Sequence, residues 1–105
     1  MRAVVRLPDS MSFVEGAGIY MNYATAWYAL DRAGARPGET VLVTGAAGGV
    51  GTCVLDLGPA FGVSTIALVS SRDKEVMARN AGATHVLRSD GDWLPQVREL
   101  TGGRG

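Results

Sequence analysis

Short apolar runs alternate along the chain with longer stretches that have helical spacing. Val41-Leu42-Val43 is apolar without alternation, as is most of 64–69, which is typical of parallel strands covered on both faces. The pattern predicts, in chain order, a strand at 41–43, a helix at 49–61, a strand at 64–69, a helix at 73–81, a strand at 84–87 and a helix at 92–101. Pro59 predicts a kink or an early end of its helix near Leu57.

The first third of the chain is predicted to be helical. Ser12 and Glu15 have the spacing of a capping box, which predicts a short helix at 13–20. Asn22 is expected to cap a second helix, which ends near Gly34. The apolar stripe of that second helix, which we expect in the core, consists of Tyr23, Ala26, Trp27 and Leu30.

A glycine-rich turn joins the first predicted strand to the helix that follows it. Glycines at 45, 48, 49 and 51 let the chain turn tightly and let the phosphates of a ligand approach backbone N–H groups at the helix N-terminus. Glycines also occur in turns that bind no ligand, so the elements on either side of the turn decide between the two interpretations. Here a strand precedes the turn, a helix follows it, and a second strand completes one βαβ unit. The segment therefore predicts dinucleotide binding, with a purely structural turn as the alternative.

Composition narrows the classes of function. The 105 residues suffice for one domain, and ten basic and ten acidic residues give a formal net charge of zero. Zero net charge provides no electrostatic basis for binding nucleic acid or a membrane surface. No apolar run is long enough to span a bilayer and no signal-peptide pattern is present, so a cytoplasmic location is expected. The single cysteine, Cys53, excludes an internal disulfide and is expected to be a buried structural thiol.

The predicted order of strands and helices forms part of a larger architecture. It is the first mononucleotide-binding half of a Rossmann-like α/β fold, a doubly wound parallel sheet, with about three strands. The ligand crevice of that fold needs a strand from the second half beside the first strand. Without it, the first strand keeps a bare apolar edge, which soluble proteins avoid. We therefore expect this chain to be a truncated piece of a larger protein.

Six segments, which together run through nearly the whole chain, form a family pattern. They are Leu7-Pro8-Asp9-Ser10-Met11-Ser12-Phe13, Tyr23-Ala24-Thr25-Ala26-Trp27-Tyr28-Ala29-Leu30, Arg36-Pro37-Gly38-Glu39-Thr40-Val41-Leu42-Val43, Gly45-Ala46-Ala47-Gly48-Gly49-Val50-Gly51, Arg72-Asp73-Lys74 and Ala81-Gly82-Ala83. In order and spacing they resemble the zinc-free, quinone-oxidoreductase-like branch of the medium-chain dehydrogenase/reductases, which includes the enoyl reductases. The resemblance implies that 1–36 is a helical lead-in segment joined to a catalytic lobe missing here, and that 37–105 is a partial NAD(P)-binding Rossmann domain.

The resemblance also implies a set of cofactor-binding residues. Backbone N–H groups of the glycine turn, which Gly45 and Gly51 frame, would hold the pyrophosphate at Ala47, Gly48, Gly49 and Val50. Thr25 matches a threonine that lies near the nicotinamide in the family, and Asn22 occupies a neighbouring position. Ser89 stands where family members often place a tyrosine near the adenosine.

The end of the second strand distinguishes NAD(H) from NADP(H). An acidic side chain there accepts a hydrogen bond from the ribose 2′-hydroxyl and repels a 2′-phosphate. Val69 stands where that acid would be expected, and the two hydroxyls and two cations that follow suit a phosphate. These residues are Ser70, Ser71, Arg72 and Lys74. We therefore expect NADP(H) to be preferred over NAD(H); the alternative is that Arg72 and Lys74 are only a solvated helix start.

Zinc is not expected. In zinc-dependent relatives of this family, a cysteine just before the threonine-bearing helix is a ligand, and Met21 stands at that position here. His85, the only histidine, lies in the third predicted strand, far from any second ligand. The sequence therefore predicts no metal site.

Three functions are compatible with the glycine turn and its surroundings. The resemblance implies the cofactor-binding part of an NADPH-dependent oxidoreductase that transfers hydride to an electron-poor small molecule, a quinone or an α,β-unsaturated carbonyl. Its catalytic residues are not identified, and a homodimer is the expected assembly of the full-length protein. The second candidate is a short-chain dehydrogenase/reductase, whose glycine motif also fits Thr44 to Gly51. Against it, 43 residues precede Thr44, and no tyrosine follows Tyr28 to form that family's Tyr-x-x-x-Lys pair. The third is a non-catalytic dinucleotide-binding module.

Overall fold

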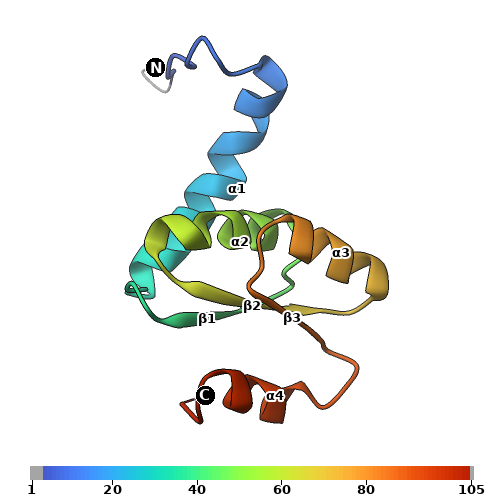
Figure 1. Cartoon of the computed structure of the whole chain (residues 1–105). Coiled ribbons are helices and arrows are strands. Elements are labelled where there is room, and N and C mark those ends of the chain that lie inside the picture. Colours follow the sequence, from blue (N-terminus) through green and yellow to red (C-terminus); the bar gives the residue numbers. More distant parts are fainter. Residues whose placement is uncertain (1–3, 105) are drawn as a thin grey trace.

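The computed structural model describes residues 4–104, which form an α/β fold around three parallel strands (Figure 1). The elements, in chain order, are α1 (Phe13–Arg32), β1 (Thr40–Thr44), α2 (Gly49–Phe61), β2 (Ser64–Val69), α3 (Arg72–Asn80), β3 (His85–Arg88) and α4 (Trp93–Leu100). The sheet order is β1-β2-β3, with β2 in the centre. The predicted Rossmann-like, three-stranded parallel half is therefore confirmed.

The three strands run in register, so their carboxyl ends meet at one edge of the sheet. Leu42 of β1 lies opposite Ile66 of β2, and Leu68 of β2 lies opposite Leu87 of β3. At the start of β2, the Thr65 N–H donates to Thr84 Oγ1 (3.0 Å), while the Thr84 N–H donates to Thr65 Oγ1 (3.2 Å). Thr65 is almost fully buried, so this reciprocal pair satisfies its hydroxyl while it fixes the entry into β3.

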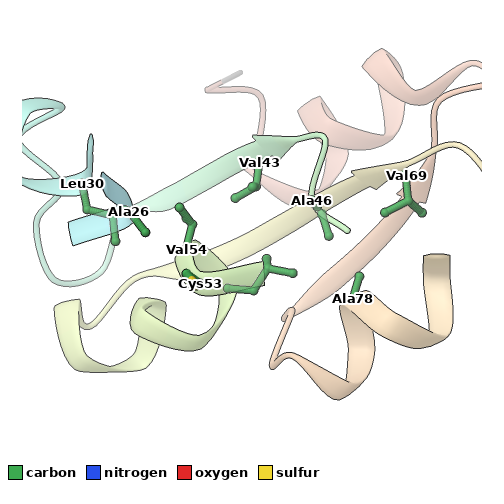
Figure 2. Close-up of a cluster of buried hydrophobic side chains, with 10 residues drawn as sticks. Ala26, Leu30, Val43, Ala46, Cys53, Val54, Val69 and Ala78 are labelled. Carbon is green, nitrogen blue, oxygen red and sulfur yellow. The ribbon is translucent and has the colours of Figure 1, made fainter. Parts of the chain in front are cut away.

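Helices cover the sheet unevenly. In Figure 1, α2 and α3 lie on one face of the sheet and α4 lies on the other. Figure 2 shows the buried cluster on the α2 and α3 side, where Ala78 of α3 points toward Val69 of β2. Leu42 of β1, expected to be covered on both faces, is 37% exposed, because α4 packs against β3 rather than β1.

The first helix differs from its prediction. The capping box is confirmed, because the Glu15 N–H donates to Ser12 Oγ (3.2 Å) and the Ser12 N–H donates to Glu15 Oε2 (2.8 Å). The predicted break at Asn22 is wrong: α1 is a single helix of 20 residues. Its sequence has no proline, and the preference of asparagine for caps is too weak to end a helix whose next turn is buried against α2.

Packing against α2 explains which residues of α1 are buried. Ala26 and Leu30 are buried and face the side of α2 that carries Val54 (Figure 2). Trp27, expected in the core, is 52% exposed; its ring instead meets the edge of the Phe61 ring, with centroids 6.4 Å apart. Tyr23, also predicted in this stripe, is half-buried and packs against the same cluster, while the tryptophan lies at its border.

The predicted helix at 49–61 is confirmed as α2, and of the two alternatives given for Pro59, the early end near Leu57 is wrong. The helix continues past Pro59 to Phe61 and ends at Gly62, whose φ of +69° is left-handed. Because Pro59 lies in the last turn, it removes only one hydrogen bond near the helix end. The buried Gly58 allows the close approach to β2, since a Cβ there would lie 3.0 Å from Thr65 Cγ2.

The N-terminal half of α1 extends away from the sheet (Figure 1). Phe13, Val14, Tyr20 and Met21 are all exposed on it. Within 4–104, none of the helices is both long enough and apolar enough to cross a membrane.

Candidate functional site

A cleft opens at the carboxyl ends of β1 and β2, between the glycine turn and the start of α3. It has a volume of about 440 Å³ and is lined by Thr44, Gly45, Ala46, Ala47, Gly48, Leu68, Val69, Ser70, Lys74 and Ser89. Open parallel sheets bind their ligands in the crevice beyond the carboxyl ends of the strands. The cleft brings together part of the predicted cofactor set, namely Gly45, Ala47, Gly48, Ser70, Lys74 and Ser89.

Backbone geometry explains the first and last glycines of the turn. Gly45 adopts a left-handed φ of +59°, which disfavours other residues. A Cβ on Gly51 would lie 2.5 Å from Gly45 O and 2.8 Å from Ala46 Cα, so only glycine lets α2 begin this close to β1. Gly45 and Gly51 therefore shape the turn.

The start of α2 supplies the hydrogen-bond donors. Its N-cap is Gly48, and within the described chain no side chain caps this end and no acidic residue stands in its first turn. The first-turn N–H groups, on Gly49, Val50 and Gly51, have no acceptor inside the helix, and the helix dipole makes this end electropositive. The Gly48 N–H already donates to Gly45 O (2.9 Å), so Gly48 contributes its lack of a side chain rather than a donor.

Asn22 and Thr25 of α1 lie in different surroundings. A Cβ added to Gly49 would come within 2.8 Å of Asn22 Nδ2, so the Asn22 amide sits at the start of α2. Thr25 Oγ1 donates to Met21 O (2.6 Å), and Thr25 lies in a separate shallow hollow with Met21 and Tyr28. The described part of the chain thus places Asn22 at the glycine turn but does not bring Thr25 into the cleft.

The segment after β2 places one cation in the cleft. Lys74 Nζ donates to Ser70 Oγ (3.0 Å), and both residues line the cleft. Ser71 is the N-cap of α3, where its Oγ accepts from the Lys74 N–H (3.4 Å). Arg72 is exposed and does not line the cleft. Of the predicted segment, Ser70 and Lys74 form the cleft wall and Ser71 holds the helix start.

The far wall of the cleft includes Ser89. Its N–H donates to Val69 O (2.8 Å), which ties the chain after β3 to the end of β2. Thr44, Ala46, Leu68 and Val69 also line the cleft but were absent from the predicted set. Their signal in the sequence is that each lies at or just beyond the carboxyl end of a predicted strand.

A second hollow lies between α1 and α2, away from the glycine turn. There the Tyr23 hydroxyl donates to Asp56 Oδ2 (2.6 Å), and this hydrogen bond, with burial as a smaller cause, raises the pKa of Tyr23 to about 12. Cys53 is buried nearby, as predicted, and burial raises the pKa of its thiol, with Asp56 as the lesser cause. Neither side chain reaches the cleft.

Residues 49–105, more than half of the chain, match the family model described as zinc-binding dehydrogenase. The chain belongs to the zinc-binding dehydrogenase family. Although the family is described by its zinc, residues 4–104 hold no group of three or more His, Cys, Asp or Glu side chains that could bind a metal ion. The absence of zinc in the whole protein stays a prediction.

Three relatives show what the chain is similar to. The highly reducing polyketide synthase curS1 of Aspergillus terreus is 39% identical over 109 residues, which cover 99% of this chain and 5% of that protein. The quinone oxidoreductase of Pseudomonas syringae pv. Tomato DC3000 is 36% identical, with a TM-score of 0.85 over 95% of this chain and 31% of that one. Escherichia coli quinone oxidoreductase, solved as an NADPH complex, is 31% identical, with a TM-score of 0.85 over the same shares.

These matches confirm the predicted membership in the quinone-oxidoreductase-like medium-chain dehydrogenase/reductases and favour it over the short-chain alternative. They also support an NAD(P)-binding oxidoreductase domain. The chain spans less than a third of the quinone oxidoreductases and about a twentieth of the polyketide synthase.

Proposed function

We propose that this chain is the cofactor-binding part of an NADPH-dependent oxidoreductase that transfers hydride to an electron-poor small molecule, a quinone or an α,β-unsaturated carbonyl. The observation that carries the cofactor choice is the hydrogen bond between Lys74 Nζ and Ser70 Oγ, 3.0 Å long, in the cleft wall. A cation and a hydroxyl held together suit a phosphate. Val69 provides no carboxylate to bind a 2′-hydroxyl instead.

The residues of the chain fit the other parts of the cofactor as well. The uncapped N-terminus of α2 offers the N–H groups of Gly49, Val50 and Gly51 to a pyrophosphate. When bound, NADPH would supply the hydride, and this half of the site would orient it. We assign no catalytic residue within the chain.

The acceptor class is supported by the relatives. Quinone oxidoreductases solved with NADPH favour a quinone, and the reducing polyketide synthases are consistent with reduction of an unsaturated carbonyl. The proposal includes a zinc-independent, cytoplasmic enzyme without nucleic-acid or membrane partners, which acts as a homodimer.

Replacing Lys74 tests the cofactor preference. In the full-length protein, Lys74→Ala is expected to weaken NADPH binding by about tenfold or more, because a charge-assisted hydrogen bond to the phosphate is lost, while NADH binding changes by less than about twofold. Titration of nicotinamide fluorescence measures both affinities. Arg79→Ala, at the opposite end of α3, is the matched control. Equal losses for the two cofactors would show that Lys74 does not contact the 2′-phosphate.

Turnover tests the reaction. The full-length protein is expected to oxidise NADPH in the presence of a naphthoquinone or an α,β-unsaturated thioester, followed by the loss of NADPH absorbance. Tight NADPH binding without turnover on both kinds of acceptor would instead support a non-catalytic dinucleotide-binding module.

A further inference from the structure

An arginine at the end of β3 joins two carboxylates. Arg88 Nη2 donates to Asp90 Oδ2 (2.6 Å), and Arg88 Nη1 lies 3.5 Å from Glu75 Oε1. The Arg88 and Glu75 side chains are 35% and 28% exposed, whereas Asp90 is 61% exposed. The cluster of Arg88, Glu75 and Asp90 thus connects α3 with the loop after β3.

This cluster adjoins the proposed 2′-phosphate end of the cleft. Glu75 follows Lys74 directly in sequence, while Arg88 and Asp90 flank Ser89; Lys74 and Ser89 both line the cleft. Neither Glu75 nor Asp90 lines it. The two carboxylates therefore belong to residues next in sequence to Lys74 and Ser89, but both lie outside the cleft lining.

The negative charges of Glu75 and Asp90 bear on which cofactor the cleft accepts. A carboxylate close to a 2′-phosphate repels it, so Glu75 and Asp90 would favour NAD(H) unless their charge is compensated. Arg88 supplies a positive charge that both carboxylates share. The cluster thus holds one guanidinium against two carboxylates, which leaves a single negative charge between them.

We infer that Arg88 is a positioning residue for the choice of cofactor. It neutralises Glu75 and Asp90 and holds both carboxylates outside the cleft, which lets the pair of Ser70 and Lys74 accept a 2′-phosphate. This inference rests on the proposed preference for NADP(H).

The test compares variants of the full-length protein by titration with NADPH and NADH. Arg88→Gln is expected to weaken NADPH by about tenfold and NADH by less than about twofold, because two uncompensated carboxylates act only on the extra phosphate. The difference between the cofactors should shrink in high salt. In the triple variant Arg88→Gln, Glu75→Gln, Asp90→Asn, NADPH affinity should return to within about threefold of the unmodified protein, since the repulsion is gone. Arg79→Gln is the control on the same helix.

The outcomes separate the two proposals. Failure of the unmodified protein to prefer NADPH would overturn the proposed function, and this inference with it, before any variant is compared. Equal losses for both cofactors in Arg88→Gln would show a structural role only. A loss that the triple variant does not restore would show that the guanidinium binds the phosphate itself. If Arg88→Gln does not fold, the pair Glu75→Gln, Asp90→Asn should tighten NADPH relative to NADH, and an unchanged ratio would contradict the inference.

Discussion

The glycine at position 51 allows a stringent test of how the turn is built. In Gly51→Ala, the new Cβ would lie 2.5 Å from Gly45 O, 2.8 Å from Ala46 Cα and 2.9 Å from Ala46 C. All three atoms are backbone, so the start of α2 or the turn itself must move. Overpacking of this kind costs about 1–3 kcal/mol, and the upper part of that range applies because no flexible side chain can yield. Alanine also favours the helix by about 1 kcal/mol relative to glycine, which offsets part of the cost.

The net expectation is that Gly51→Ala lowers the free energy of unfolding by about 1–2 kcal/mol. Gly18→Ala is the matched control, because Gly18 lies within α1, past its first turn, and a Cβ there meets nothing within 4 Å. That control should raise the free energy of unfolding by about 0.5–1 kcal/mol. Urea unfolding followed by circular dichroism measures both changes. If Gly51→Ala proved as stable as Gly18→Ala, the close contact of α2 with the turn would be refuted.

Two further predictions concern the hollow between α1 and α2. Because the pKa of Tyr23 is raised to about 12, mainly by its hydrogen bond to Asp56, the stability it contributes is fully present below the unfolded pKa of about 10 and is lost as the pH rises through 12. Ultraviolet titration of tyrosinate should show one late tyrosine, and Asp56→Asn should lower its pKa; no change would contradict the role of Asp56. The buried thiol of Cys53, whose pKa burial raises, should react with iodoacetamide far more slowly in the folded protein than in urea, and equal rates by mass spectrometry would show that the thiol is accessible.

The strands and the glycine turn could be predicted because their signals are local. Apolar runs without alternation indicate strands of a parallel sheet, and the glycines indicate a turn between a strand and a helix. The same local argument failed at Asn22, where a weak helix-ending signal competed with burial of the next turn against α2, and burial prevailed. At Pro59 the helix continues because the proline already lies in its last turn.

The position of Thr25 could not be predicted for a different reason. Which side of a helix faces a site depends on its rotation about its own axis. For α1 this rotation is set by Ala26 and Leu30, which pack against α2. That rotation brings Asn22 to the start of α2 and turns Thr25 toward a separate hollow with Tyr28. A family resemblance names such residues, but only the contact between the helices places them.

The charges that bear on cofactor preference likewise depend on contacts between elements that are far apart in the sequence. In the sequence, the cations Arg72 and Lys74 favour a phosphate, but they alternate with the acidic residues Asp73 and Glu75, and the sequence alone does not show which of these charges face the cleft. The structure separates these charges. Lys74 reaches Ser70 in the cleft wall, whereas Glu75 turns to Arg88 outside it. A phosphate in the cleft would therefore meet Lys74 directly, while the Glu75 carboxylate is paired with Arg88 outside the cleft lining. Under the proposed preference for NADP(H), the place where the carboxylates are held matters as much as the presence of the lysine.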